Sequence, residues 1–131
     1  MPPIHVCFYQ EAQGDAPVLN WLTELRRFRP KAFIKCRERI QLLTEHGIDL
    51  RRPHADYLED SIYELRAKEG RVQYRILYAL VGQEAVLLHA FSKEGAIPVM
   101  ELQRAQDRRR AFASNPPAHT YEDDLPEERK R

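Results

Sequence analysis

The sequence predicts a small α+β domain, in which an antiparallel sheet carries a helical hairpin from the first half of the chain on one face. Two amphipathic segments with helical spacing follow a short β-branched run, which indicates one strand and two helices. Three alternating segments come next, separated by turns that contain glycine, as is typical of antiparallel hairpins. The 131 residues suit one domain, and 43% hydrophobic residues are enough for one core.

The first half of the chain supplies one strand and the helical hairpin. Residues 4–9 (IHVCFY) alternate as a strand does. Asp15 is the expected N-cap of a helix that runs to about residue 28, and Pro30 opens a second helix that ends at residue 46, before Gly47. Residues 48–60 have no clear period and contain Pro53, so we expect a connecting loop there.

The second half supplies three strands and a helix, which completes the order β-α-α-β-β-β-α. Strands are expected over residues 62–68, 71–80 and 85–92, and a third helix over residues 98–112. Residues 1–113 then form the domain. Residues 114–131 are rich in proline and charge, so we expect them to form a disordered tail.

Several classes of protein do not fit the composition. No segment approaches the roughly 20 apolar residues of a membrane span, and the start of the chain does not resemble a secretory signal. Cys7 and Cys36 form no CxxC motif, which argues against a zinc site or a disulfide framework. Glycine-rich phosphate loops, GxSxG and HExxH are absent from the sequence. We therefore expect a cytoplasmic protein with no cofactor, metal or membrane partner.

Alternation along the three later strands predicts two different faces. The apolar face, expected under the helical hairpin, holds Tyr63, Leu65, Ala67, Val72, Tyr74, Ile76, Tyr78, Leu80, Val86, Leu88 and Ala90. The opposite face collects Glu64, Arg66, Lys68, Arg71, Gln73, Arg75, His89, Phe91 and Lys93. The net charge is only +1, so any binding of a polyanion depends on this local concentration of cations. A solvated face with no ligand has the same charge pattern and stays an alternative.

An ordered set of motifs resembles a known family. The chain reads RPHADYL at residues 52–58, YELR at 63–66, YRILY at 74–78 and LLHAFSK at 87–93. Over residues 4–112 this set resembles the RelE/ParE superfamily of toxins, in particular its HigB-like, phage-derived branch. The resemblance implies the RelE-like β-α-α-β-β-β-α fold. It also implies a metal-free, ribosome-dependent endoribonuclease that cuts mRNA and inhibits translation, held inactive by a cognate, HigA-like helix-turn-helix antitoxin.

The resemblance also assigns candidate residues to this chemistry. RNA cleavage without a metal uses the ribose 2′-OH as nucleophile and needs a base, an acid and cations for the phosphate. Arg66 and Arg75 are expected to hold the phosphate, His89 to transfer protons, and Lys93 to supply charge or a proton. The expected RNA-binding residues are His54, Lys68, Arg71, Gln73 and Phe91.

Two alternatives use the same fold. The superfamily includes inhibitors of DNA gyrase, so the chain can instead be a non-enzymatic inhibitor of a protein target. Glu94 stands where many relatives have a second lysine. This difference leaves open an inactive module that binds the antitoxin and has lost the cleavage chemistry.

Overall fold

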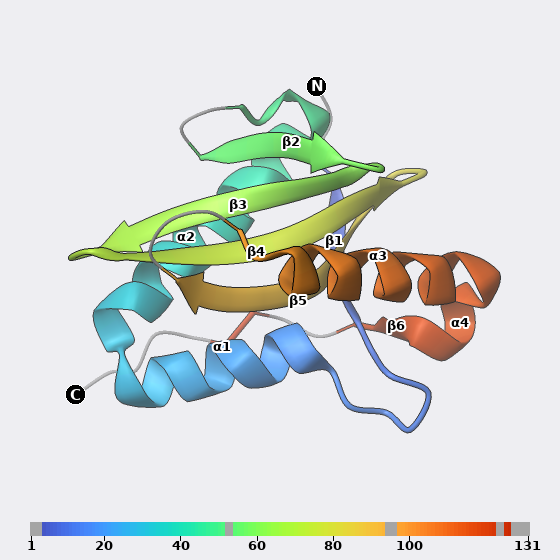
Figure 1. Ribbon diagram of the computed structural model, residues 1–131, viewed down its shortest axis with the longest axis horizontal. Helices are drawn as coiled ribbons and strands as arrows, with labels where there is room; N and C mark the ends of the chain where they lie inside the picture. Colours follow the sequence, from blue (N-terminus) through green and yellow to red (C-terminus); the bar gives the residue numbers. More distant parts are fainter. Residues whose placement is uncertain (1–3, 52–53, 94–96, 123–124, 127–131) are drawn as a thin grey trace.

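A six-stranded sheet between two helical layers forms the centre of the protein in the computed structural model, which describes residues 4–51, 54–93, 97–122 and 125–126 (Figure 1). The strand order is β2-β3-β4-β5-β1-β6. The strands are β1 (His5–Tyr9), β2 (Ala55–Glu59), β3 (Ile62–Glu69), β4 (Val72–Val81), β5 (Glu84–Lys93) and β6 (Thr120–Tyr121). Adjacent strands pair antiparallel except β1 with β5, which are parallel. The predicted α+β class is confirmed.

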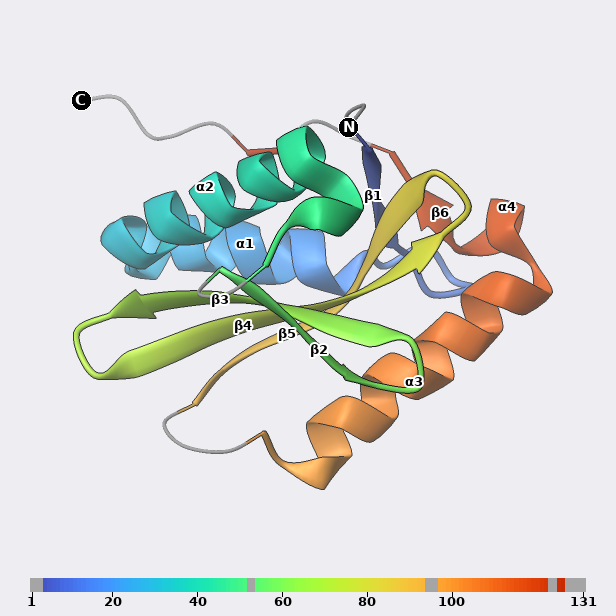
Figure 2. The same cartoon turned by 90° about the horizontal axis from the view of Figure 1, so that it is seen from above.

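The helical hairpin packs on one face of this sheet, as the sequence predicted. Helices α1 (Pro17–Phe28) and α2 (Pro30–His46) lie together on one side, and α3 (Val99–Ser114) lies on the other (Figure 2). Pro30 occupies the first turn of α2, and Gly47 ends that helix with a φ of +56°, which glycine adopts without strain. The expected N-cap at Asp15 is wrong: Pro17 begins α1, so Ala16 takes the cap position.

The segment between α2 and β3 is more regular than the expected loop. A short 3-10 helix, η1 (Gly47–Asp49), is followed by the edge strand β2, which pairs with β3. Asp60 and Ser61 both have positive φ, the type I′ geometry that suits a two-residue hairpin turn. The alternation of apolar and polar residues did not predict β2, because the apolar residues of this edge strand do not all face the core. Tyr57, for example, is 53% exposed.

The segment that follows α3 also differs from the expectation of disorder. Helix α4 (Pro116–His119) leads into β6, and β6 pairs with β1. The His119 ring stacks on Tyr9 at 5.3 Å between centroids, and the Gln10 amide donates to the Ala118 carbonyl oxygen at 3.2 Å. These contacts come from Tyr9 and Gln10, at and just after the end of β1 and far away in the sequence, so the proline-rich composition of the segment did not reveal them. Residues 123–124 and 127–131 lie outside the described residues.

A bulge in β5 changes the predicted division of side chains between the two faces. Leu77 pairs with His89, whereas Tyr78 pairs with Leu87, so Leu88 is the extra residue. Val86 and Leu88 therefore belong to the core under α3, where we expected them under the hairpin. The core under the hairpin instead receives Ala85 and Leu87.

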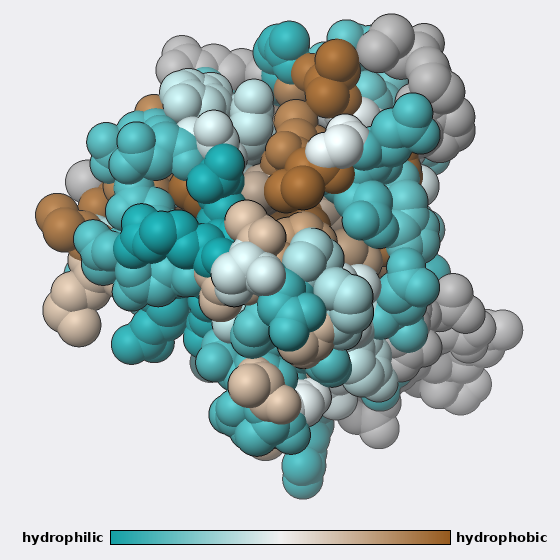
Figure 3. All heavy atoms as spheres, turned by 90° about the vertical axis from the view of Figure 1, so that its right-hand side faces the viewer, coloured by the Kyte–Doolittle hydropathy of each residue, from teal (hydrophilic) through white to brown (hydrophobic). Residues whose placement is uncertain are grey.

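Helix α3 thus covers part of the face that we expected to be open. Its residues Ala105 and Phe112 are buried in a second core, together with Cys7, Tyr9, Ile62, Leu77, Ala79, Val86, Leu88 and Phe91. On the side of the molecule shown in Figure 3, hydrophilic side chains predominate, and apolar ones gather in the upper centre and at the left edge. Among the described residues, no helix combines the length and apolar character that crossing a bilayer requires.

Candidate functional site

The two arginines expected to bind phosphate lie side by side on the face of the sheet opposite the hairpin. Arg66 of β3 pairs directly with Arg75 of β4, and Glu64 precedes Arg66 by two residues on the same face. Arg75 Nη1 donates to Glu64 Oε2 at 3.1 Å, and Arg66 Nε lies 3.5 Å from Glu64 Oε1. Like charges directly opposite each other repel. The Glu64 carboxylate between the guanidinium groups offsets this repulsion and orients both of them.

Glu64 is buried, and this determines its electrostatic role. Only 2% of the residue is exposed, and burial raises the pKa of its carboxyl group, while the charges of Arg75 and Arg66 offset part of the increase. The side chain of Arg75 is 12% exposed and that of Arg66 is 31% exposed. Arg66 is therefore the more accessible cation for an incoming phosphate, and Arg75 is the more firmly held.

Three of the expected RNA-binding residues come together with Arg66 in a groove of about 330 Å³. Arg66, His54, Lys68 and Gln73 line it, together with Arg39 from α2. Arg39 was not predicted, because a lone arginine on the polar side of an amphipathic helix carries no signal in the sequence. Arg71 is exposed in the turn between β3 and β4 and does not line this groove.

The structure places His89 in a buried network beneath α3. Only 7% of the residue is exposed, and its Nε2 atom lies 2.8 Å from Glu101 Oε1. Its Nδ1 atom lies 3.0 Å from Arg108 Nη1, and Arg108 Nε in turn lies 3.2 Å from Glu11 Oε1. Because a guanidinium group can only donate, Nδ1 must accept, which assigns the proton to Nε2. Both ring nitrogens are therefore engaged, and the ring is neutral.

The environment of His89 also favours the neutral ring. Burial lowers the pKa of His89 below its ordinary value of 6.5, Arg108 lowers it further, and the hydrogen bond to Glu101 opposes part of this decrease. An unfolded chain therefore takes up a proton at His89 at a higher pH than the folded protein does. This difference couples the stability of the protein to pH.

We expect the free energy of unfolding to decrease as the pH falls below about 6.5, because protonation of His89 favours the unfolded state. Urea unfolding at neutral and at mildly acidic pH, with His89→Gln as the control, measures this contribution. The decrease should be smaller in the variant. An equal decrease in both proteins would show that His89 does not titrate as the buried network requires.

The remaining expected site residues lie near the end of β5. Lys93 is exposed and pairs with Gln73 of β4. Phe91 pairs with Arg75, but its ring is buried and stacks on His89 at 5.7 Å between centroids. The buried ring of Phe91 therefore offers no exposed face on which an RNA base could stack. Glu94 lies outside the described residues.

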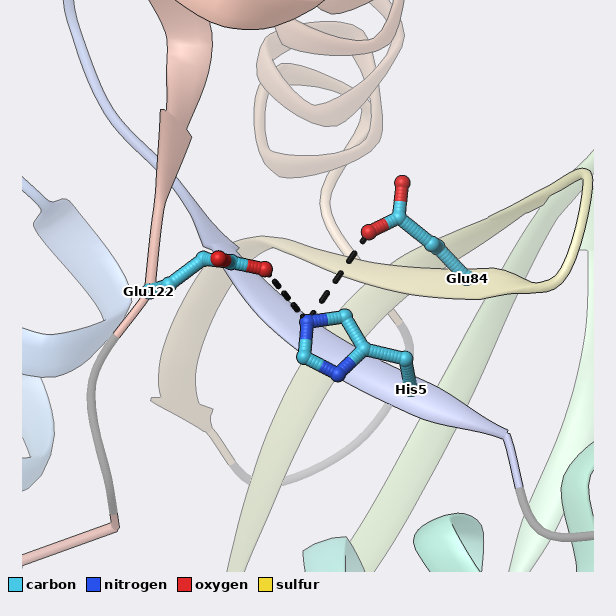
Figure 4. Close-up of side chains that lie close together, drawn as sticks. All are labelled: His5, Glu84 and Glu122. Atoms are coloured by element: carbon cyan, nitrogen blue, oxygen red, sulfur yellow. Dashed lines mark hydrogen bonds and ion pairs between the residues drawn. The ribbon is translucent and has the colours of Figure 1, made fainter.

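A separate cluster could hold a divalent ion. His5, Glu84 and Glu122 place their ligand atoms within 4.8 Å of one another (Figure 4). His5 Nε2 lies 2.5 Å from Glu122 Oε1 and 3.9 Å from Glu84 Oε2, so the ion pairs alone account for this arrangement. The cluster lies at β1, the start of β5 and the end of β6, and β4 separates it from β3. We assign it no part in the candidate site.

Fold and site together define a small α+β protein whose sheet carries a helical hairpin on one face and paired arginines on the other. The chain belongs to the family of phage-derived Gp49-like proteins (DUF891), whose model matches residues 23–110. This family is a RelE/ParE-like toxin family of toxin–antitoxin systems, so the resemblance is confirmed at that level. The comparison with curated proteins gave no match.

Proposed function

We propose that this protein is the toxin of a toxin–antitoxin system and that it cleaves mRNA on the ribosome, as the resemblance to HigB-like toxins implies. The observation that carries the proposal is the pair of arginines oriented by the buried Glu64 beside a cationic groove. Such an arrangement suits a phosphodiester, because guanidinium groups bind phosphate oxygens through two parallel hydrogen bonds. The proposal includes a cytoplasmic location and a cognate, HigA-like antitoxin with a helix-turn-helix domain.

In the proposed reaction the 2′-OH oxygen of the ribose attacks the adjacent phosphorus. Its proton passes to a base, the bond to the 5′-oxygen breaks, and that oxygen leaves with a proton from an acid. Arg66 and Arg75 stabilise the extra negative charge on the phosphate. We assign proton transfer to His89, and Lys93, exposed at the end of β5, supplies charge or the proton for the leaving oxygen. The reaction involves no metal or organic cofactor.

The buried network sets a condition on His89. Its neutral ring suits a general base, but Glu101 and Arg108 of α3 occupy both nitrogens. His89 can therefore reach an RNA substrate only after these contacts open. The engaged nitrogens favour a second candidate function as well, a non-enzymatic inhibitor of a protein target such as DNA gyrase, because such an inhibitor needs no free imidazole.

Growth of a host after induction of the chain tests the proposal. We expect growth arrest, which co-expression of the antitoxin reverses. Arg66→Ala should abolish the arrest, because it removes the more exposed of the two phosphate-binding cations. The control is Arg27→Ala, since Arg27 lies on α1 with its guanidinium over the Phe28 ring, on the opposite side of the sheet.

The possible results of this assay separate the candidate functions. Arrest that persists in Arg66→Ala would contradict the assigned site. Arrest with intact transcripts and a DNA-damage response would support the gyrase-type inhibitor. A chain that binds its antitoxin but never slows growth would be the inactive module.

A further inference from the structure

The outer edge of β3 is covered by side chains of α2 along the part that β2 does not reach. Residue pairing between β2 and β3 extends to Leu65, opposite Ala55, and the Arg66 N–H next to it donates to the His54 carbonyl oxygen at 2.9 Å. Beyond that point, Arg39 Nε donates to the Arg66 carbonyl oxygen at 2.9 Å, and Lys35 Nζ donates to the Lys68 carbonyl oxygen, also at 2.9 Å. Charged side chains thus satisfy backbone acceptors at a strand edge, which protects the edge from pairing with another chain.

This contact fixes Arg39 at the rim of the cationic groove. The bond from Nε to the carbonyl oxygen uses one of the five N–H donors of the guanidinium group, so four donors can bind a second partner. The Arg39 side chain is already held in place, and binding therefore loses less side-chain entropy than it would with a free arginine.

The lining of the groove matches a polyanion. Three permanent cations, a histidine and an amide line it, and no carboxylate does among the residues that the structure describes. The charge of Arg66 is shared with Glu64 and Asp56. Within the described ranges, neither Arg39 nor Lys68 forms an ion pair with a carboxylate. These two side chains therefore add charge that an anion can use beside Arg66.

We propose that this groove binds the phosphodiester backbone of single-stranded RNA next to the phosphate held by Arg66 and Arg75, with Arg39 as its anchor. The proposal rests on the proposed function, to which it adds a path for the substrate around the edge of β3 onto α2. The groove volume, about 330 Å³, lies at the small end of the range for ligand pockets, which suits a short segment of one phosphodiester backbone.

Binding of a short, fluorescently labelled 2′-O-methyl RNA tests the groove without cleavage, because the methyl group blocks the nucleophile. The dissociation constant, Kd, is measured by anisotropy over a series of salt concentrations. Arg39→Ala should raise Kd about tenfold and reduce the slope of log K against log salt by about 0.7, the value for one lost phosphate contact on a single strand. Arg39→Lys keeps the charge and should keep the slope, and Arg27→Ala should change neither quantity.

Loss of the Arg39 bond to the strand edge can also disturb the fold, so a second variant is needed. Lys68 is exposed, and Lys68→Ala should reduce the slope by the same amount with an unchanged melting temperature. If the slopes of Arg39→Ala and Lys68→Ala both equal that of Arg27→Ala, the groove proposal is overturned. RNA binding that depends on Arg39 in a protein that cuts no transcript would support the groove while refuting the cleavage.

Discussion

Replacing Arg75 by methionine is expected to lower the free energy of unfolding by roughly 3 kcal/mol and to abolish growth inhibition. Glu64 is 2% exposed and accepts the hydrogen bond of Arg75 at 3.1 Å. Without Arg75, the buried carboxylate keeps its longer contact to Arg66, at 3.5 Å, as its one remaining ion pair among the described residues. An incompletely compensated charge in the interior is costly, since its hydration is lost and not replaced. Urea unfolding measures the loss of stability, and a growth assay measures the loss of toxicity.

A double variant separates the structural role of this pair from its functional role. Glu64→Leu combined with Arg75→Met removes both charges together, so we expect the stability to recover to within about 1 kcal/mol of the unmodified protein. Arg66 stays accessible to water and keeps Asp56 at 4.0 Å. Toxicity should remain absent, because the phosphate has lost one of its two arginines. A stable and fully toxic double variant would contradict the assignment of Arg75 to the site.

Phe112→Ala is expected to lower the free energy of unfolding by about 3–5 kcal/mol, because it leaves a cavity between α3 and the sheet. Phe112 is 2% exposed and belongs to the core under α3. Met100→Ala on the same helix is a matched control: Met100 is 74% exposed, so the change should stay within about 0.5 kcal/mol. Denaturant titration of both variants measures the difference.

The result for Phe112 tests whether α3 is an integral part of the fold. If α3 packs as described, Phe112→Ala should also expose His89, whose contacts to Glu101 and Arg108 depend on the position of the helix. Amide hydrogen exchange in β5 should then increase. Equal stabilities of Phe112→Ala and Met100→Ala would mean that α3 does not cover this face in solution.

Most of the fold follows from local signals in the sequence. The predicted limits of α2 are confirmed, because Pro30 and Gly47 define its two ends. The three long strands were also found, since their alternation is strong and glycine marks the turns between them. The two strands that the sequence did not predict form through tertiary contacts. Strand β2 forms by pairing with β3, and β6 forms by pairing with β1.

The candidate site was predictable only in part. The alternation of side chains along the strands predicted Arg66 and Arg75 on the same face. The structure places these two residues directly opposite each other. The bulge at Leu88 moves Val86 and Leu88 to the face opposite the predicted one. The alternation of apolar and polar residues does not reveal a bulge. Burial of His89 depends on where α3 docks, and the contribution of Arg39 depends on where β2 begins. Local sequence contains neither piece of information.

Mapping of transcript ends after brief induction of the chain tests the central claim most directly. Primer extension would compare the unmodified protein with Arg66→Ala, with and without a block of translation initiation. The proposed function predicts new 5′ ends within translated frames that appear only with the unmodified protein and vanish when initiation is blocked. Intact transcripts in growth-arrested cells would contradict it and would point to a protein target instead.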